Sequence, residues 1–168
     1  MGELTFFSDR AFLCAFAVFA VTSLVFEPYV VFGQDFAACA RLDPVCHTWA
    51  WYNTFDPIFE KENLPFFLRL MCAVDMAVFG PMYLVLIRAF VRKDDRIRLP
   101  GLCFVAAIVY STVIYFGVEL VEEAHRANLA VVVLVNIPYT IVPLLLGVRL
   151  WGDGPVFETE ENAVRKRK

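Results

Sequence analysis

Apolar residues gather into four long runs along this chain, and shorter polar or charged segments separate them. The runs cover Ala11–Phe32, Leu70–Ile87, Leu102–Val118 and Ala127–Val148. Glu27 is the single charged residue of the first run, Asp75 is that of the second, and the last two runs carry none. A helix needs about 20 apolar residues, within a range of roughly 17–25, to cross the hydrocarbon core of a bilayer. The pattern therefore predicts four membrane-spanning helices.

Helices are expected because backbone groups inside lipid must be satisfied within the segment or within a closed barrel. The alternating pattern of membrane barrel strands is absent from these runs. The first run also exceeds the roughly 7–15 residues of a cleaved signal core, so it is expected to remain as a span. Residues 1–152 are therefore predicted to form one all-α domain, an integral membrane four-helix bundle, and residues 153–168 a cytosolic tail with a basic end.

The composition agrees with this class and excludes several others. Apolar residues make up 60% of the chain, whereas an average soluble domain has roughly 45–50%. This excess excludes a disordered chain, a collagenous repeat and a small disulfide scaffold. The formal net charge is −3 and the basic residues form short local clusters, which is not the footprint of a nucleic-acid-binding protein. The lipid bilayer is the expected partner.

The basic residues predict the orientation of the spans. They cluster between the second and third spans and at the C-terminal end, at Arg88, Arg92, Lys93, Arg96, Arg98 and 165–168. Because positive residues favour the cytoplasmic side, both termini are expected in the cytosol. The terminal cluster is similar to a dilysine retrieval signal with Arg165 in place of one lysine, so the expected location is the endoplasmic reticulum membrane. A stop-transfer cluster that only fixes orientation is the alternative.

The first link, Gly33–Asn63, is the longest segment outside the spans and would lie on the lumenal side. It carries aromatic rings suited to the membrane interface at Trp49, Trp51, Tyr52, Phe55 and Phe59. Cys39 and Cys46 also lie in it, where a disulfide is chemically permitted, and the sequence leaves open whether they are bonded. No Cys and His spacing matches a zinc site, so neither a metal nor a cofactor is expected.

Ionisable residues inside the spans carry the strongest functional signal, since a charge at the bilayer centre costs at least about 2.5–3.5 kcal/mol. Glu27 and Asp75 are expected at similar depth in the lumenal half, and Asp56 lies in the link that joins their spans. Three carboxylates can thus converge at the lumenal mouth of one cavity. Such a group could bind an amine, hydrogen-bond a sterol hydroxyl or move a proton in catalysis. A polar brace between helices is the alternative.

The third and fourth spans add neutral polar groups. Ser111, Tyr115 and Glu119 are spaced by four residues and share one helix face. Asn136 and Tyr139 follow on the fourth span. Hydrogen bonds between helices account for Ser111 and Asn136 as well as ligand contacts do. We expect Ser111, Asn136 and Tyr139 to give the cavity its polar edges.

Four segments are together similar to the EXPERA domain, which the sigma-2 receptor and the emopamil-binding sterol isomerases share. They read SLVFEP on the first span, WYNTFDPIFEKE before the second, MCAVDMAVFGPMYLVLIRAF through the second and NIPYTIVP on the fourth. The resemblance implies a four-helix core that encloses a lumen-side intramembrane ligand cavity. It also implies residence in the endoplasmic reticulum and a part in cholesterol homeostasis through partner proteins.

The two branches of this family differ at several positions. The isomerases place a His where this chain has Ser23, a Glu where it has Cys72 and a Trp where it has Tyr139, whereas Asn136 matches their pattern. Two of the side chains expected for proton shuttling are therefore missing. Sigma-2 receptors carry similar carboxylates, one in the first link and one on the second span. Glu27 occupies the position of their ligand-binding carboxylate. The resemblance favours the receptor-like branch.

The expected function is binding of a sterol, an oxysterol or a hydrophobic cationic amine in the cavity. Glu27 would pair with an amine, Asp56 would orient Glu27 and share a proton with it, and Asp75 would line the pocket. One alternative is a Δ8–Δ7-type sterol isomerase in which Glu27 donates or accepts the proton. Another is a membrane scaffold with an unoccupied cavity. Cholesterol-transport membrane proteins and a second copy of the chain are the candidate protein partners.

Overall fold

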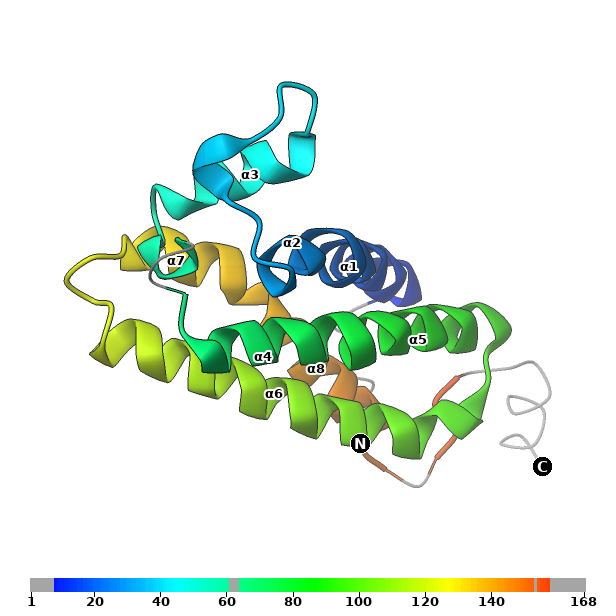
Figure 1. Ribbon diagram of the computed structural model, residues 1–168. Coiled ribbons are helices and arrows are strands. Elements are labelled where there is room, and N and C mark those ends of the chain that lie inside the picture. The colour runs from blue at the N-terminus through cyan, green and yellow to red at the C-terminus, as the bar shows by residue number, and fades with distance from the viewer. Residues whose placement is uncertain (1–7, 61–63, 153, 158–168) are drawn as a thin grey trace, which may run out of the picture.

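The structure, a computed structural model, describes residues 8–60, 64–152 and 154–157, and its regular elements in these ranges are all helical. The main helices are α1 (Asp9–Val21), α2 (Glu27–Val31), α3 (Pro44–Asn53), α4 (Phe66–Val74), α5 (Gly80–Arg92), α6 (Arg98–Val121), α7 (Leu129–Asn136) and α8 (Pro138–Leu150). Helix α6 packs against α8, α5 against α1, and α4 against α2, and Figure 1 shows α3 outside these pairs on the side of α2 and α7. The arrangement is a helical bundle with one helix set across it.

Four helical stretches are long and apolar enough to cross a membrane. They are Asp9–Val31, Phe66–Arg92, Asp95–Val121 and Leu129–Leu150. This confirms the prediction of an all-α bundle with four spans, which places the bilayer against its outer faces. The first of these stretches extends beyond its apolar run at the N-terminal end, and the second and third extend at both ends. Helical hydrogen bonding continues there into the polar residues that flank each run.

The first span is interrupted by a π-helical turn, Thr22–Phe26, which lies just before Pro28. Proline has no N–H, so a carbonyl on the preceding turn loses its usual donor. In the wider π-helical turn, the Glu27 N–H donates to the Thr22 carbonyl, five residues back. The π-helical turn therefore places Glu27 at the junction of two helical segments.

The second and fourth spans are interrupted in related ways. A π-helical turn, Asp75–Phe79, precedes Pro81, and the Gly80 N–H donates to the carbonyl five residues back. On the fourth span, Pro138 starts α8 directly after the break that ends α7. Single π turns occur often at functional sites, where they shift side chains out of the regular helical positions. Three spans thus deviate from straight helices beside a proline.

An aromatic core fills the half of the bundle away from α3. Its buried rings come from three spans and include Phe12, Phe16, Phe19, Tyr83, Phe90 and Phe104. The ring centroids of neighbouring pairs lie 4.5–7 Å apart in the usual aromatic geometry; the Phe16 and Phe90 centroids, for example, lie 5.4 Å apart at right angles. This half is densely packed and leaves the space inside the bundle at the other end.

Ionic contacts close the same aromatic end. The carboxylate of Asp9, at the start of α1, pairs with Lys93 and with Arg149. The Asp95 carboxylate accepts hydrogen bonds from the backbone N–H groups of Val156 and Phe157, at 3.0 and 3.2 Å. These contacts hold the last turn of the fourth span and the loop between spans two and three together.

The chain after α8 packs on the bundle at first. Phe157 is 1% exposed and its ring meets that of Phe90 at a centroid distance of 5.1 Å. Part of the expected tail, up to Phe157, therefore covers the aromatic core. The basic cluster at 165–168 lies outside the described residues.

Gly80 lies where the first and second spans approach closely. A Cβ atom added there would lie 2.6 Å from Leu24 Cδ2 and 3.2 Å from Ser23 Cβ. By contrast, no atom lies within 4 Å of the position that a Cβ at Gly117 would take. A side chain at position 80 would therefore clash with the first span, whereas one at position 117 would not.

We predict that Gly80→Ala lowers the thermal stability of the protein, by about 1–3 kcal/mol, because overpacking forces the two spans apart. The matched control, Gly117→Ala, should leave stability unchanged or raise it slightly, since alanine favours the helix. Thermal unfolding of both purified variants in the same detergent measures the difference. Equal midpoints for the two variants would show that spans one and two are not in close contact at Gly80.

Candidate functional site

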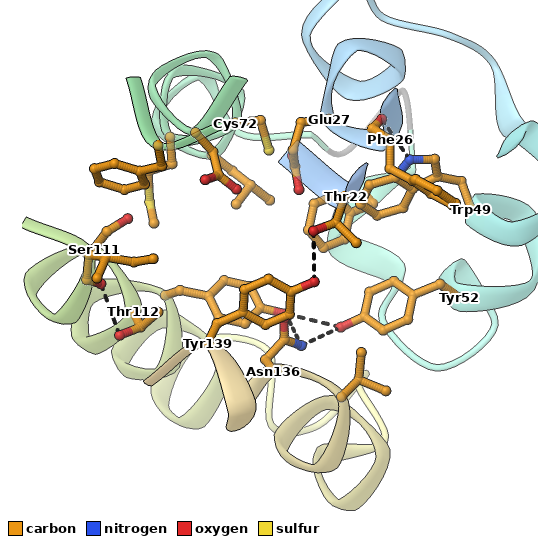
Figure 2. A pocket seen from close by; sticks show the side chains of 18 of the residues that line it. Thr22, Phe26, Glu27, Trp49, Tyr52, Cys72, Ser111, Thr112, Asn136 and Tyr139 are labelled. Carbon is orange, nitrogen blue, oxygen red and sulfur yellow. Dashed lines mark hydrogen bonds between the residues drawn. The ribbon is translucent and has the colours of Figure 1, made fainter. Parts of the chain in front are cut away.

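A cavity of about 370 Å³ lies between the spans, next to α3. Its lining comes from all four spans and from α3, and Figure 2 shows side chains from these elements converging on it. Most of the lining is apolar or aromatic, for example Phe26, Trp49, Phe59, Leu68, Phe79 and Ile108. Volumes of roughly 300–1,000 Å³ with mainly apolar walls and a few polar groups are typical of small-molecule sites. The cavity is the candidate site.

Two carboxyl groups lie on the wall formed by the first two spans. Glu27 and Asp75 both line the cavity and interact electrostatically. Ser23 Oγ donates to Asp75 Oδ1 at 3.2 Å, and the Cys72 thiol lies beside the Glu27 carboxyl. Glu27 Oε2 is buried and accepts no hydrogen bond from any described residue. This confirms that Glu27 and Asp75 lie at the same level of the bundle.

The lining offers these acids no counter-charge. Among the described residues, no Lys, Arg or His side chain lines the cavity. An ionised carboxylate in such surroundings is costly unless a cation or hydrogen-bond donor reaches it. A ligand with an ammonium group would supply that partner.

Neutral polar groups form a second wall, contributed by α3 and the last two spans. Asn136 Nδ2 donates to Tyr52 Oη at 2.8 Å and to the Val132 carbonyl at 2.8 Å. Tyr52 Oη and Tyr115 Oη lie 3.2 Å apart. Asn136, Tyr52 and Tyr115 all line the cavity. Figure 2 shows Asn136 and Tyr52 across the cavity from Glu27 and Cys72.

Asp56 lies behind this second wall and does not line the cavity. It is fully buried, and Tyr115 Oη donates to its Oδ2 at 2.7 Å. Burial raises the pKa of the Asp56 carboxyl above its ordinary value, although the hydrogen bond from Tyr115 acts in the opposite direction. Burial together with the neighbouring Asp56 charge also raises the pKa of Tyr52.

The carboxyl groups are paired differently from the expectation. Asp56 was expected to orient Glu27 and share a proton with it, but it accepts its side-chain hydrogen bond from Tyr115. Glu27 instead meets Cys72 and Asp75. The reason is the path of the link: α3 ends at Asn53, and the turn before Pro57 directs Asp56 toward the third span.

The other expected site residues lie at the cavity. Tyr139 Oη donates to Thr22 Oγ1 at 2.9 Å and its ring stacks on Phe19 at a centroid distance of 4.3 Å. Ser111 lines the cavity from the third span. Five of the expected residues therefore share one cavity, and they are Glu27, Asp75, Ser111, Asn136 and Tyr139.

The helix α3 covers the cavity and was not foreseen as a wall. Trp49 Nε1 donates to the Phe26 carbonyl at 2.9 Å, which ties α3 to the first span. A disulfide between Cys39 and Cys46 holds the start of this helix to the preceding turn, which settles the pairing that the sequence left open. The sequence did contain a signal for this wall, since Trp49 and Tyr52 are three residues apart and therefore share one helical face.

The interfacial interpretation of the rings is only partly right. Trp49, Tyr52 and Phe59 are buried between α3 and the spans, whereas Trp51 is 57% exposed. Cys72 was also missed as a cavity residue. It precedes Asp75 by three residues, so the position of Asp75 already placed it on the same face.

Comparison with protein families gives one match. A family model described as EXPERA, the EXPanded EBP superfamily, matches residues 44–150, which is more than half of the chain. The matched region holds α3 and spans two to four, and Glu27 lies before it. No curated protein and no solved structure gave a match.

Proposed function

Since this chain belongs to the EXPERA superfamily, we propose that it is a multi-pass membrane protein whose cavity binds a sterol, an oxysterol or a hydrophobic cationic amine. The superfamily covers both sigma-2 receptor-like proteins and sterol isomerases, so membership alone does not choose between them. The choice rests on the chemistry of the cavity.

One observation carries the proposal: two carboxyl groups face an apolar cavity whose described lining contains no cation. Glu27 Oε2 is left without a hydrogen-bond donor. An ammonium group attached to an apolar body would neutralise this wall while its body replaces water along the aromatic and aliphatic residues. In the proposed complex, Glu27 pairs with the amine and Asp75 lines the same wall.

The polar side chains favour binding without chemistry. A double-bond shift requires one group to deliver a proton and another to remove one. Ser23 occupies the position at which the isomerases carry a His, and here it is fully buried and donates to Asp75. Cys72 stands in place of a Glu and lies beside Glu27. We therefore favour the receptor-like function and keep the isomerase as the second candidate.

We predict that Glu27→Gln lowers affinity for a hydrophobic amine by roughly a hundredfold, because a buried charge loses its partner. Affinity for an uncharged sterol should change little, since glutamine keeps the size and hydrogen-bonding capacity of the side chain. Radioligand binding to the purified protein measures both. Glu122→Gln makes the same substitution at an exposed site outside the cavity and serves as the control. Equal losses for amine and sterol would mean that Glu27 is structural.

A second experiment separates binding from catalysis. Incubation of the purified protein with a Δ8 sterol, followed by chromatography and mass spectrometry, should return the sterol unchanged while the amine still binds. Conversion to the Δ7 isomer that Glu27→Gln abolishes would contradict the receptor-like function and support the isomerase. Conversion that survives this substitution would indicate a contaminating enzyme, which a preparation from cells without the protein identifies.

We also propose residence in the endoplasmic reticulum with both termini in the cytosol. The basic residues between spans two and three support this orientation. A glycosylation sequon introduced at Leu42, which is 92% exposed, should be modified, and one placed after Phe157 should not. The reverse pattern would contradict the orientation. A role in cholesterol homeostasis through cholesterol-transport proteins extends this proposal and rests on the family resemblance. A second copy of the chain is a further proposed partner.

A further inference from the structure

The hydrogen bonds on the second wall of the cavity run in one direction. The amide of Asn136 fixes one end, because the atom that lies 2.8 Å from the Val132 carbonyl must be a donor. That atom is therefore Nδ2, and its second proton points to Tyr52 Oη, which accepts it at 2.8 Å. The orientation of the amide thus follows from the acceptor-only nature of a carbonyl oxygen.

The two tyrosine hydroxyls continue the chain. Tyr115 has a single hydroxyl proton, and it is donated to Asp56 Oδ2 at 2.7 Å. In the contact of 3.2 Å between Tyr52 and Tyr115, Tyr52 must therefore be the donor. Asp56 Oδ1 is buried without a partner, so a proton carried on Oδ1 would leave Oδ2 free to accept. The order of donors is therefore the same for ionised Asp56 and for Asp56 protonated on Oδ1, whereas a proton on Oδ2 would be donated to Tyr115 and would reverse the order.

This order leaves one polar atom of the group of Asn136, Tyr52 and Tyr115 unused. Both Nδ2 protons of Asn136 and both tyrosine hydroxyl protons are engaged within the chain of hydrogen bonds. Asn136 Oδ1 accepts no hydrogen bond from the described residues, yet it is not among the side-chain atoms sealed from solvent. Because Asn136 lines the cavity, the hydrogen-bonded group of Asn136, Tyr52 and Tyr115 offers a ligand an acceptor and no free donor.

We propose that Asn136 Oδ1 is a subsite for a hydrogen-bond donor on the ligand, a sterol hydroxyl above all, and that Asp56 is the positioning residue that holds the Tyr52 proton away from this subsite. This inference deepens the proposed function and rests on it. The subsite discriminates against a ligand that presents only a lone pair at this point, because two acceptors then face each other and neither is satisfied. The carboxyl wall, on the opposite side in Figure 2, remains the site for a cation.

Asp56 acts through its hydrogen-bonded partners and does not contact the ligand. Asp56 draws the proton of Tyr115, Tyr115 draws that of Tyr52, and Tyr52 then holds one proton of Asn136. Loss of the Tyr115 hydroxyl would release the Tyr52 proton, which could then turn toward the cavity. The wall would gain a donor, and its selectivity would change without loss of its shape.

The test uses three uncharged probes of one shape: cholesterol, its 3-methyl ether, which lacks the donor, and cholest-5-ene, which lacks the oxygen. Each competes with a radiolabelled hydrophobic amine for the purified full-length protein. Wild-type protein should bind cholesterol roughly tenfold more tightly than either analogue, the scale of one well-placed buried hydrogen bond. Equal affinities for the three probes would overturn the subsite, while failure of both amine and sterols to bind would overturn the proposed function itself.

Two variants locate the preference. Asn136→Leu keeps the side-chain size but removes the acceptor, so cholesterol should lose its advantage. Tyr115→Phe should reduce the advantage over the methyl ether more than that over cholest-5-ene, because the freed Tyr52 proton can meet the ether oxygen. A merely structural role for Tyr115 would weaken all three probes alike. Tyr110→Phe, at a side chain 69% exposed on the same helix, is the matched control.

Amine affinity, which depends on the opposite wall, reports whether each variant is folded. A preference for cholesterol that persists in Asn136→Leu would overturn the assignment. So would a preference that Glu27→Gln abolishes, since the hydroxyl would then bind at the carboxyl wall. If Asn136→Leu no longer binds the amine, Asn136→Ser in its place, with a shorter side chain that cannot reach the same point, should likewise remove the preference.

Discussion

Proline residues that interrupt three of the four spans impose the constraint on which the rest of this structure depends. Each proline removes a backbone donor in surroundings where lipid offers no replacement. Spans one and two respond with π-helical turns before Pro28 and Pro81, and span four breaks before Pro138. Glu27 follows the first of these turns and Asp75 begins the second. The backbone irregularities therefore position the carboxyl groups.

The resulting cavity has two polar walls with opposite requirements. The carboxyl wall lacks positive charge, so it favours a cation, whereas the hydrogen-bonded wall ends in an acceptor, so it favours a neutral donor. Apolar surface separates them. Because binding sites gain specificity from a few placed polar groups among apolar surfaces, this division is suited to amphiphiles with different groups at their two ends.

The link between the first two spans completes the cavity through contacts that are distant in sequence. A helix as short as α3 has little stability by itself. It is held by the disulfide at its start, by the bond from Trp49 to Phe26 and by the bonds of Tyr52 to Asn136 and Tyr115. The position of α3 over the cavity therefore depends on its contacts with the packed spans.

The sequence by itself determined the number of spans, their helical form and the residues that give the cavity its charge, because lipid restricts spanning segments to long apolar helices and makes each intramembrane acid exceptional. Glu27 and Asp75 could be singled out for that reason. Tertiary structure alone decided that Asp56 binds Tyr115, that Tyr52 forms a wall and that Asn136 presents its oxygen. These outcomes depend on the path of the link and on the direction of hydrogen bonds between segments far apart in the chain, which no local pattern of apolar and polar residues specifies.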